Sequence, residues 1–361
     1  MADGRDEDIL FARHGAVGLV TLNRPRALNA LTLDMIRAMD ARLRAWEADG
    51  AVTRIVLRAN GGRAFCAGGD VRAVHALARA GRDAEVGDFW DGEYGLDALI
   101  AAYPKPIVSL IGGIVMGGGN GLSVHGSHRV ASEGYRFAMP EVGIGFFPDV
   151  GMTYVLPRLP GRTGTYLALT GATIGAGDAL ALGLATHYVR ADGFDAVVAA
   201  LGEGSAVDGV LAAHAEAPPP TGPVVAERDL IDGCFSEPSV ADILARLDGA
   251  AARGSAFAAD TAALMRTRSP TSLCIAHAQM RRGVAMEFSD CIAAEIRLAG
   301  FLMRGHDFFE GVRAALLDKD GAPDWRPASL DAVDHAAIAG IFDDTGGPAP
   351  RSDREGRTDR A

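Results

Sequence analysis

The chain has 361 residues, of which 48% are hydrophobic and 22% are charged. This balance is typical of a globular protein with a sizeable core and excludes a chain that is disordered throughout. Lys and Arg number 35 against 46 Asp and Glu, which gives a formal net charge of −11. Because nucleic-acid binders usually present a basic surface, the charge disfavours nucleic acid as a partner.

The cysteines and the apolar runs indicate the compartment. The four cysteines are scattered and form no CxxC pair, so we predict neither a zinc ribbon nor a disulfide framework: they are Cys66, Cys234, Cys274 and Cys291. No stretch reaches the ~20 apolar residues of a membrane span. The acidic start, MADGRDEDIL, lacks the apolar run of a signal peptide. We therefore expect a cytoplasmic protein with no membrane partner.

The first half of the chain alternates strand and helix patterns. Residues 9–22 form two short apolar runs around a His-Gly pair, which predicts a hairpin. Thr32 is a candidate N-cap for a helix with apolar residues at helical spacing. Strands at 55–57 and 107–111 alternate with helices expected from about residue 71 and over 90–101. This order indicates an α/β fold with a mostly parallel sheet, whose site lies at the carboxyl ends of the strands.

The second half reads differently. Residues 215–223 contain three consecutive prolines and are predicted to be a loop or linker. Helical spacing follows at 224–247, 256–266, 272–282 and 287–303. We therefore predict a core at 9–200, a helical C-terminal region at 224–345 and a disordered tail, rich in Pro, Gly, Arg and Asp, at 347–361.

Two glycine-rich loops each follow a strand and precede a helix, one at 65–70 (FCAGGD) and one at 112–121 (GGIVMGGGNG). Glycine lets the backbone approach a ligand closely, and the start of a helix directs unpaired N–H groups outward. One such loop could hold a phosphate, and two could place two N–H donors on one oxygen as an oxyanion hole. Close packing of helices is the alternative explanation. A P-loop is excluded because no Gly-Lys pair occurs, and GxGxG without an acidic partner disfavours a dinucleotide site.

A third motif, AMPEVGIGFFPDVG, places Glu141 and Asp149 in an apolar stretch, each directly after a proline. A carboxylate held in an apolar pocket has a raised pKa and can act as an acid or base near neutrality. Helix capping or turn formation would explain the same residues. Ser123 and His125 do not match a nucleophile elbow, and no HExxH motif occurs, so we predict no serine nucleophile and no metal.

Together these motifs resemble the crotonase superfamily, the enoyl-CoA hydratase/isomerase fold. The resemblance extends from Ile9 to Leu330 and is carried by NRPRALNAL, FCAGGDV, GGGNGLSVHG, RVASEGYRFAMPE, GFFPDVG, LPRLPG, SPTSL and MRGHDFFEGVRAALLDKDGAPDWRPASL. Within the superfamily it is closest to the 3-hydroxyisobutyryl-CoA hydrolase subfamily. It implies a ββα spiral fold with a helical C-terminal region, an acyl-CoA-binding core, and no cofactor beyond the CoA of the substrate.

The resemblance also implies an oxyanion hole. The family stabilises the thioester oxygen with two backbone N–H groups, which match Gly69 and Gly118 here. The adjacent Gly68 and Gly117 are expected to line the same substrate site.

The family's carboxylates distinguish two reactions. The two glutamates of the hydratases fall at Gly121 and Glu141, and because only the second is a carboxylate here, addition of water to a double bond is disfavoured. The hydrolase subfamily keeps the glutamate matching Glu141, has an aspartate matching Asp149, and contacts substrate through a glutamate matching Glu93. The resemblance thus implies hydrolysis of a β-hydroxyacyl-CoA, 3-hydroxyisobutyryl-CoA, in valine catabolism, with Glu141 as nucleophile or general base. An enoyl-CoA hydratase or isomerase acting on another acyl-CoA is the alternative, and a non-catalytic acyl-CoA-binding role is a third.

Other expectations concern the edges of the site. Arg24, Arg26 and Lys319 are candidates for the CoA phosphates, although solvated surface charge explains them equally well. Asn120 stands where relatives often carry small apolar residues, so we expect a more polar pocket there. Relatives often form trimers or hexamers, which leaves a homo-oligomer open, while the helical C-terminal region could instead cap its own site.

Overall fold

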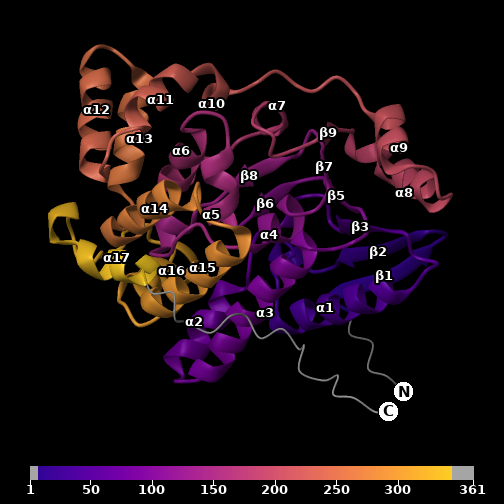
Figure 1. The fold of residues 1–361 in the computed structure, drawn as a ribbon. Coiled ribbons are helices and arrows are strands. Elements are labelled where there is room, and N and C mark those ends of the chain that lie inside the picture. The colour runs from indigo at the N-terminus through magenta and orange to yellow at the C-terminus, as the bar shows by residue number, and fades with distance from the viewer. Residues whose placement is uncertain (1–6, 344–361) are drawn as a thin grey trace.

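The computed structural model describes residues 7–343, so the predicted tail at 347–361 lies outside the described residues. Its strands form two sheets (Figure 1). The larger has six strands in the order β1 (Ile9–His14), β2 (Val17–Leu22), β3 (Arg54–Ala59), β5 (Ile107–Ile111), β7 (His128–Ala131) and β9 (His187–Tyr188). The smaller has three, in the order β4 (Ala64–Cys66), β6 (Ile114–Met116) and β8 (Arg136–Ala138). The predicted hairpin is confirmed as the antiparallel pair β1–β2, and the other pairs are parallel.

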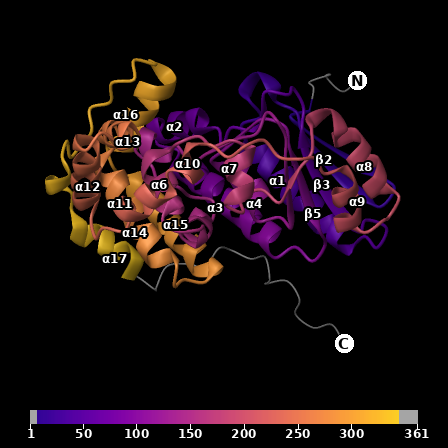
Figure 2. The same cartoon turned by 90° about the horizontal axis from the view of Figure 1, so that it is seen from above.

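Both faces of the larger sheet are buried. In β3, Ile55 and Leu57 belong to the main hydrophobic cluster, whereas Val56, on the opposite face, belongs to a second one. This second cluster is completed by α8 (Phe194–Gly202) and α9 (Val207–His214), which lie beside β2, β3 and β5 in two views (Figures 1 and 2). Because both faces are covered, the strands read as continuous apolar runs.

Four helices of the first half cover the main face or connect strands: α1 (Leu33–Ala48), α2 (Val71–Arg79), α3 (Asp83–Ala101) and α4 (Gly118–Val124). Thr32 caps α1 as predicted, its side chain accepting a hydrogen bond from Met35 N at 3.2 Å. Helix α3 begins earlier than the predicted residue 90. Its first turn contains Asp83 and Glu85, whose negative charges favour the positive end of the helix dipole.

Most of the remaining helices gather on one side of the molecule, whereas α7 (Ala176–Ala181) lies near its middle, in contact with β9 (Figure 1). The remaining helices are α5 (Met152–Val155), α6 (Thr163–Thr170), α7, α10 (Pro223–Ala226), α11 (Arg228–Phe235), α12 (Val240–Ala252), α13 (Ala256–Arg266), α14 (Pro270–Gly283), α15 (Phe288–Leu302), α16 (Asp307–Val312) and α17 (His335–Asp343). The single helix expected at 224–247 is wrong, because three helices occupy that stretch. Ser239 starts α12 by accepting a hydrogen bond from Asp242 N, and Pro238 precedes it.

The C-terminal helices share one core with the sheets. The main hydrophobic cluster includes Leu57 of β3, Tyr94 of α3 and Leu298 of α15. Helix α15 packs against α3 and α5, and α14 packs against α5 and α6. These contacts bring the C-terminal helices next to the segments that carry the candidate site, while the division at 224 stays a prediction. Within the described residues, no helix has the length and apolar character needed to cross a bilayer.

Candidate active site

The two glycine-rich loops lie side by side. Strand β4 pairs in parallel with β6, so the turns that follow both strands emerge at the same edge. Gly68 has φ +107° and Gly117 has φ +47°, a region that side-chain-bearing residues rarely adopt. A Cβ on Gly68 would lie only 3.6 Å from Gly118 N. Glycine is therefore required at both turns, and the turns present the next residues, Gly69 and Gly118, to a common space.

The amides of Gly69 and Gly118 fit the predicted oxyanion hole. Among residues 7–343, neither N–H donates to a backbone acceptor. A Cβ on Gly118 would lie 3.3 Å from Gly69 N, so the two residues are direct neighbours. Two free donors this close can bind one oxygen that gains negative charge during a reaction.

The Glu93 carboxyl lies next to both amides. A Cβ on Gly118 would collide with Glu93 Oε1, and one on Gly69 would lie 3.4 Å from the same atom. The side chain is buried and Oε1 has no hydrogen-bond partner within the described chain. Burial, and then the nearby Asp149, raise the pKa of Glu93 well above its usual value. Both effects favour the protonated form of Glu93, which can donate a hydrogen bond.

Asp149 sits on the neighbouring loop and is held by α3. The Tyr94 hydroxyl donates a hydrogen bond to Asp149 Oδ2 at 3.0 Å, both groups being buried. Burial raises the pKa of Asp149 to about 7, against the lowering effect of the Tyr94 hydrogen bond. Asp149 can therefore exchange a proton near neutrality, which is what an acid–base group requires.

Glu141 faces the second glycine loop. It opens the 3-10 turn η2 (Glu141–Ile144), and a Cβ on Gly117 would lie 3.1 Å from Glu141 Oε1. The other oxygen, Oε2, is buried without a hydrogen-bond partner among the described residues. Burial and the charge of Asp149 raise the pKa of Glu141 well above normal. Glu141 thus lies beside the glycine turn, with one oxygen unoccupied.

Aromatic side chains supply the low polarity behind these shifts. Trp90 and Phe146 stack at 5.0 Å between centroids, and Phe146 stacks on Phe147 at 4.5 Å. They lie in the same segments as the carboxyls, because Trp90 shares α3 with Glu93 and the two phenylalanines separate Glu141 from Asp149. An apolar wall destabilises the charged form of each carboxyl, and this is the main cause of the raised pKa values.

A further carboxyl lies where the sequence shows a glycine. A Cβ on Gly121 would collide with Asp97 Oδ1, so the Asp97 carboxyl fills the space of the missing side chain. Asp97 is 1% exposed, and neither oxygen has a hydrogen-bond partner within residues 7–343. Burial first, then Glu93 and Asp149, raise the pKa of Asp97 well above its usual value. Burial thus favours the protonated form of Asp97.

Comparisons with known proteins identify the family. The sequence profile of Enoyl-CoA hydratase/isomerase matches residues 17–342. The chain belongs to the enoyl-CoA hydratase/isomerase family. Curated relatives named 3-hydroxyisobutyryl-CoA hydrolase, mitochondrial, include those of Xenopus tropicalis (43% identity, over 95% of this chain and 90% of that protein) and Homo sapiens (40%, 94% and 89%).

Two solved structures are similar to this chain in both fold and sequence. One is a carnitinyl-CoA dehydratase from Mycobacterium thermoresistibile, 43% identical with a TM-score of 0.87 over 93% of this chain and 96% of that one. The other is an enoyl-CoA hydratase from Rhodobacter sphaeroides 2.4.1, 40% identical with a TM-score of 0.86 over 93% and 97%. These likenesses confirm the crotonase fold expected from the motifs.

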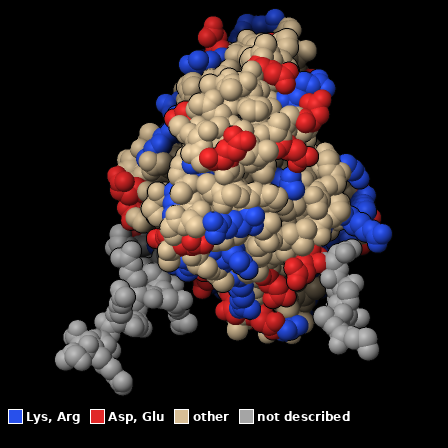
Figure 3. Space-filling view, turned by 90° about the vertical axis from the view of Figure 1, so that its right-hand side faces the viewer, with Lys and Arg blue, Asp and Glu red and all other residues tan. Residues whose placement is uncertain are grey.

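The candidate phosphate-binding arginines differ in availability. Arg24 pairs with Asp8 and Asp70, both at 3.3 Å, and donates to Ala30 O at 2.6 Å. Its charge is therefore largely neutralised by neighbours. Arg26, by contrast, is exposed. Over the face seen in Figure 3, acidic and basic side chains are interspersed. Binding of CoA by either arginine stays a prediction.

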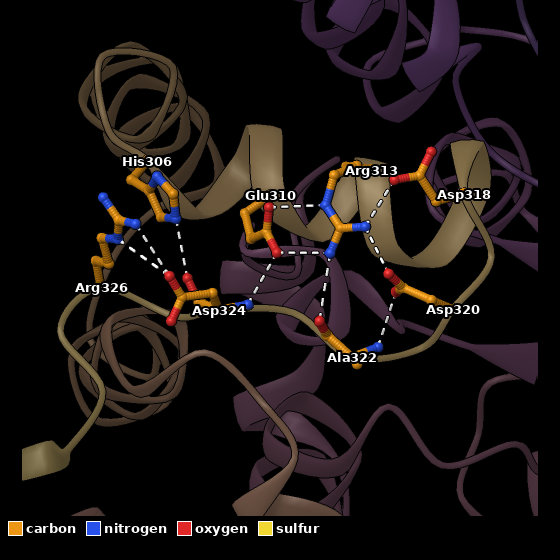
Figure 4. Close-up of polar contacts among 8 residues, drawn as sticks. All are labelled: His306, Glu310, Arg313, Asp318, Asp320, Ala322, Asp324 and Arg326. Atoms are coloured by element: carbon orange, nitrogen blue, oxygen red, sulfur yellow. Dashed lines mark hydrogen bonds and ion pairs between the residues drawn. The ribbon is translucent and has the colours of Figure 1, made fainter.

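A single arginine, Arg313, orders the turn that contains Asp318 and Asp320 (Figure 4). Arg313 pairs with Glu310 at 2.7 Å, Asp318 at 2.7 Å and Asp320 at 2.6 Å. Lys319 stands between the last two, with φ +58°, and is exposed. Arg313 thus fixes the turn, and Lys319 stays a candidate for the CoA phosphates.

Three site residues escaped the sequence analysis: Tyr94, Asp97 and Glu295. Glu295 carried the signal that identified Glu141, a lone carboxylate in an apolar stretch, here CIAAEIRLAGFL. Tyr94 and Asp97 follow Glu93 on α3 by one and four residues, so a helical projection from Glu93 would have placed Asp97 on the same face. The Asn120 side chain, expected to add polarity, donates to Ala138 O at 3.0 Å.

The raised pKa of Asp149 predicts how stability depends on pH. Because the folded-state value, about 7, exceeds the ordinary 3.8, the folded protein holds this proton more tightly than the unfolded chain. The contribution of this proton to the free energy of unfolding is fully present below about pH 4 and is lost as the pH rises through 7. Asp149→Asn removes this loss, which is at most ~4 kcal/mol. We expect the Tm of the variant to exceed that of the wild type at pH 8.5 and to approach it at pH 5.

Differential scanning fluorimetry at both pH values measures this difference. Asp208→Asn is a suitable control, since Asp208 is an exposed carboxylate on α9, paired with His128 away from the site. The difference between the Tm of Asp149→Asn and that of the wild type should be larger at pH 8.5 than at pH 5. A smaller difference at pH 8.5 would contradict the raised pKa of Asp149.

Proposed function

We propose that this protein hydrolyses a β-hydroxyacyl-CoA thioester and that 3-hydroxyisobutyryl-CoA is its substrate. The observation that carries the proposal is the pairing of two free amides, Gly69 and Gly118, with Glu141 and Asp149, while position 121 has no carboxylate. The names of the curated relatives support the same reaction and substrate.

The thioester carbonyl oxygen would accept hydrogen bonds from the N–H groups of Gly69 and Gly118. As a carbonyl carbon becomes tetrahedral, its oxygen gains negative charge, and removing one such donor typically costs ~3 kcal/mol of activation free energy. The carbon–sulfur bond then breaks and CoA leaves as a thiolate that takes up a proton.

The Glu141 carboxylate has two routes to this step. As a nucleophile it forms a carbon–oxygen bond to the acyl group, giving a mixed anhydride that water hydrolyses. As a general base it removes a proton from water, whose oxygen attacks the carbonyl carbon. In both routes Asp149, with its pKa of about 7, can supply the proton for the departing thiolate or accept one from water. Glu93, which lies beside the amides, would hydrogen-bond the substrate hydroxyl.

Hydration of an enoyl-CoA is the second candidate, because the two solved structures described above carry the names of a dehydratase and a hydratase. The Asp97 carboxyl fills the space beside Gly121 and could replace the absent glutamate. The Asp97 carboxyl comes from α3, however, and not from position 121, where the family's glutamate would stand. The curated relatives are named hydrolases, and these names favour the hydrolase.

Three wider expectations accompany the proposed reaction. The thioester is already activated, so no metal or redox cofactor is needed. We propose a place in valine catabolism on the family resemblance. The relatives' names assign those proteins to mitochondria, whereas we propose the cytoplasm for this chain. Its four cysteines are unpaired and buried, which suits a reducing compartment. A homo-oligomer is compatible with the proposal, and light scattering would determine the state.

The first test separates the two reactions with two substrates. Purified protein incubated with 3-hydroxyisobutyryl-CoA should release free CoA, whereas crotonyl-CoA should keep its double bond, both followed by mass spectrometry. Glu141→Gln should reduce CoA release by at least about a hundredfold, because the amide can neither attack nor accept a proton. Hydration of crotonyl-CoA without CoA release would exclude the hydrolase and establish the hydratase.

The amide pair can be tested by adding one methyl group. In Gly118→Ala the new Cβ meets Glu93 Oε1, so the carboxyl must move and the space between the amides narrows. We expect kcat for CoA release to fall by about 10²–10³, the loss typical of one oxyanion donor. Gly87→Ala on α3 is the matched control, since its Cβ meets nothing within 4 Å. Wild-type rates in Gly118→Ala would refute the assignment of the amide pair.

Asp97→Asn tests whether the Asp97 carboxyl takes part in proton transfer. Because burial favours the protonated form of Asp97, an amide of the same shape should leave CoA release within about threefold of wild type, or under ~0.7 kcal/mol in activation free energy. The steady-state rate with 3-hydroxyisobutyryl-CoA measures this. A hundredfold loss would instead make Asp97 a proton donor or acceptor and would revive the two-carboxylate mechanism.

A further inference from the structure

The loop that carries Asp149 is held from the C-terminal helices. Gly151 N donates to Glu295 Oε2 at 2.7 Å, and Thr153 N donates to Glu295 Oε1 at 2.9 Å. On the other side of Asp149, Pro148 O accepts a hydrogen bond from Gln279 Nε2 at 2.9 Å. Glu295 belongs to α15 and Gln279 to α14, so both attachments come from residues more than a hundred positions away in sequence.

This loop needs such support because its backbone is strained. Val150, directly after Asp149, has φ +53°, a left-handed conformation that is unfavourable for a β-branched residue. Gly151 follows with φ +82°, where a Cβ would lie 2.5 Å from His125 Cε1. His125 Nε2 in turn lies 2.7 Å from Val150 O and, because burial lowers the pKa of His125 to about 4, the ring is neutral and donates from Nε2. Strained backbone persists only where its surroundings fix it.

Within the described residues, the hydrogen bonds of Glu295 are made with this loop. Glu295 is fully buried on the apolar face of α15, among neighbours such as Ile292 and Leu298. Each of its oxygens accepts one hydrogen bond from the loop backbone. A carboxylate buried in such a place costs free energy unless its hydrogen bonds compensate. The role of Glu295 therefore follows from its hydrogen-bond partners, which lie on the loop that carries Asp149.

We propose that Glu295 is a positioning residue that fixes the Asp149 carboxyl for proton transfer, assisted by Gln279. The inference rests on the proposed function, since it assigns Glu295 a role through Asp149. It also gives the C-terminal helices a specific part in the site. They set the place of an acid–base group from within the same chain, in addition to packing on the core.

A double-mutant cycle tests whether Glu295 acts through Asp149. Glu295→Gln replaces one acceptor oxygen with an NH₂ group that faces a backbone N–H, so one loop contact is lost. With 3-hydroxyisobutyryl-CoA we expect kcat to fall about 10- to 100-fold, the effect of leaving one buried backbone N–H without its acceptor, with KM changing less than about threefold. In an Asp149→Asn background the same change should reduce kcat less than about threefold. Equal losses in both backgrounds would overturn the inference.

Hydrogen exchange measures the loop without relying on activity. In Glu295→Gln the amides of Gly151 and Thr153 lose protection, so the peptide spanning 149–155 should exchange at least about tenfold faster. Gln279→Met, which keeps the length of the side chain and removes its donor, should show a smaller effect in the same peptide. Asp178→Asn is the matched control, because Asp178 is also buried and accepts a backbone hydrogen bond, from Gly222 N, away from this loop. Unchanged exchange in Glu295→Gln would overturn the inference.

The two proposals fail in different ways. If the wild type releases no CoA, the proposed function is wrong, and hydrogen exchange still decides whether Glu295 holds the loop. If the wild type is active and Asp149→Asn is impaired, but Glu295→Gln keeps its kcat, the function stands and the positioning role is refuted.

Discussion

The site depends on the burial of carboxyls that water would otherwise keep ionised. Glu93, Asp97, Glu141, Asp149 and Glu295 are each at most 7% exposed, and burial is the first cause of every raised pKa among them. Like charges so close cannot all ionise together, so protons are shared within the cluster. The structure thereby holds protons in the place where a reaction with acid and base steps needs them.

This burial is possible because the backbone supplies what the side chains lack. The glycine turns at 68 and 117 bring two N–H groups to the carboxyl cluster without adding a side chain or a charge. Free N–H donors favour whichever nearby oxygen is negative. The Glu93 carboxyl lies next to these donors, but its Oε1 has no hydrogen-bond partner among the described residues. Both donors are therefore available to the substrate oxygen of the proposed reaction.

The features that the sequence predicted are those that depend on residues close together in the chain. The hairpin, the Thr32 cap and the two glycine turns rest on neighbouring residues, and the structure confirms them. The contact of Tyr94 with Asp149 joins residues 55 positions apart, and that of Glu295 with the loop joins residues more than 140 apart. No periodicity encodes such pairs, because they arise only when α3 and α15 pack together. The failed helix at 224–247 has a local cause, the Pro-Ser pair before α12, that apolar spacing alone did not register.

The choice between hydrolysis and hydration depends on position 121 and on the carboxyl beside it. A glutamate there would bring its own carboxylate into the cluster, whereas glycine leaves the space to Asp97, whose position on α3 is fixed by the helix. Asp97 lies in the field of Glu93 and Asp149 and has no donor to stabilise its ionised form within the described residues. Placing the carboxyl on α3 instead of α4 therefore keeps the volume filled but attaches the group to a different part of the backbone. Under the proposed function, Glu141 is then the one family glutamate that remains beside the amides of Gly69 and Gly118.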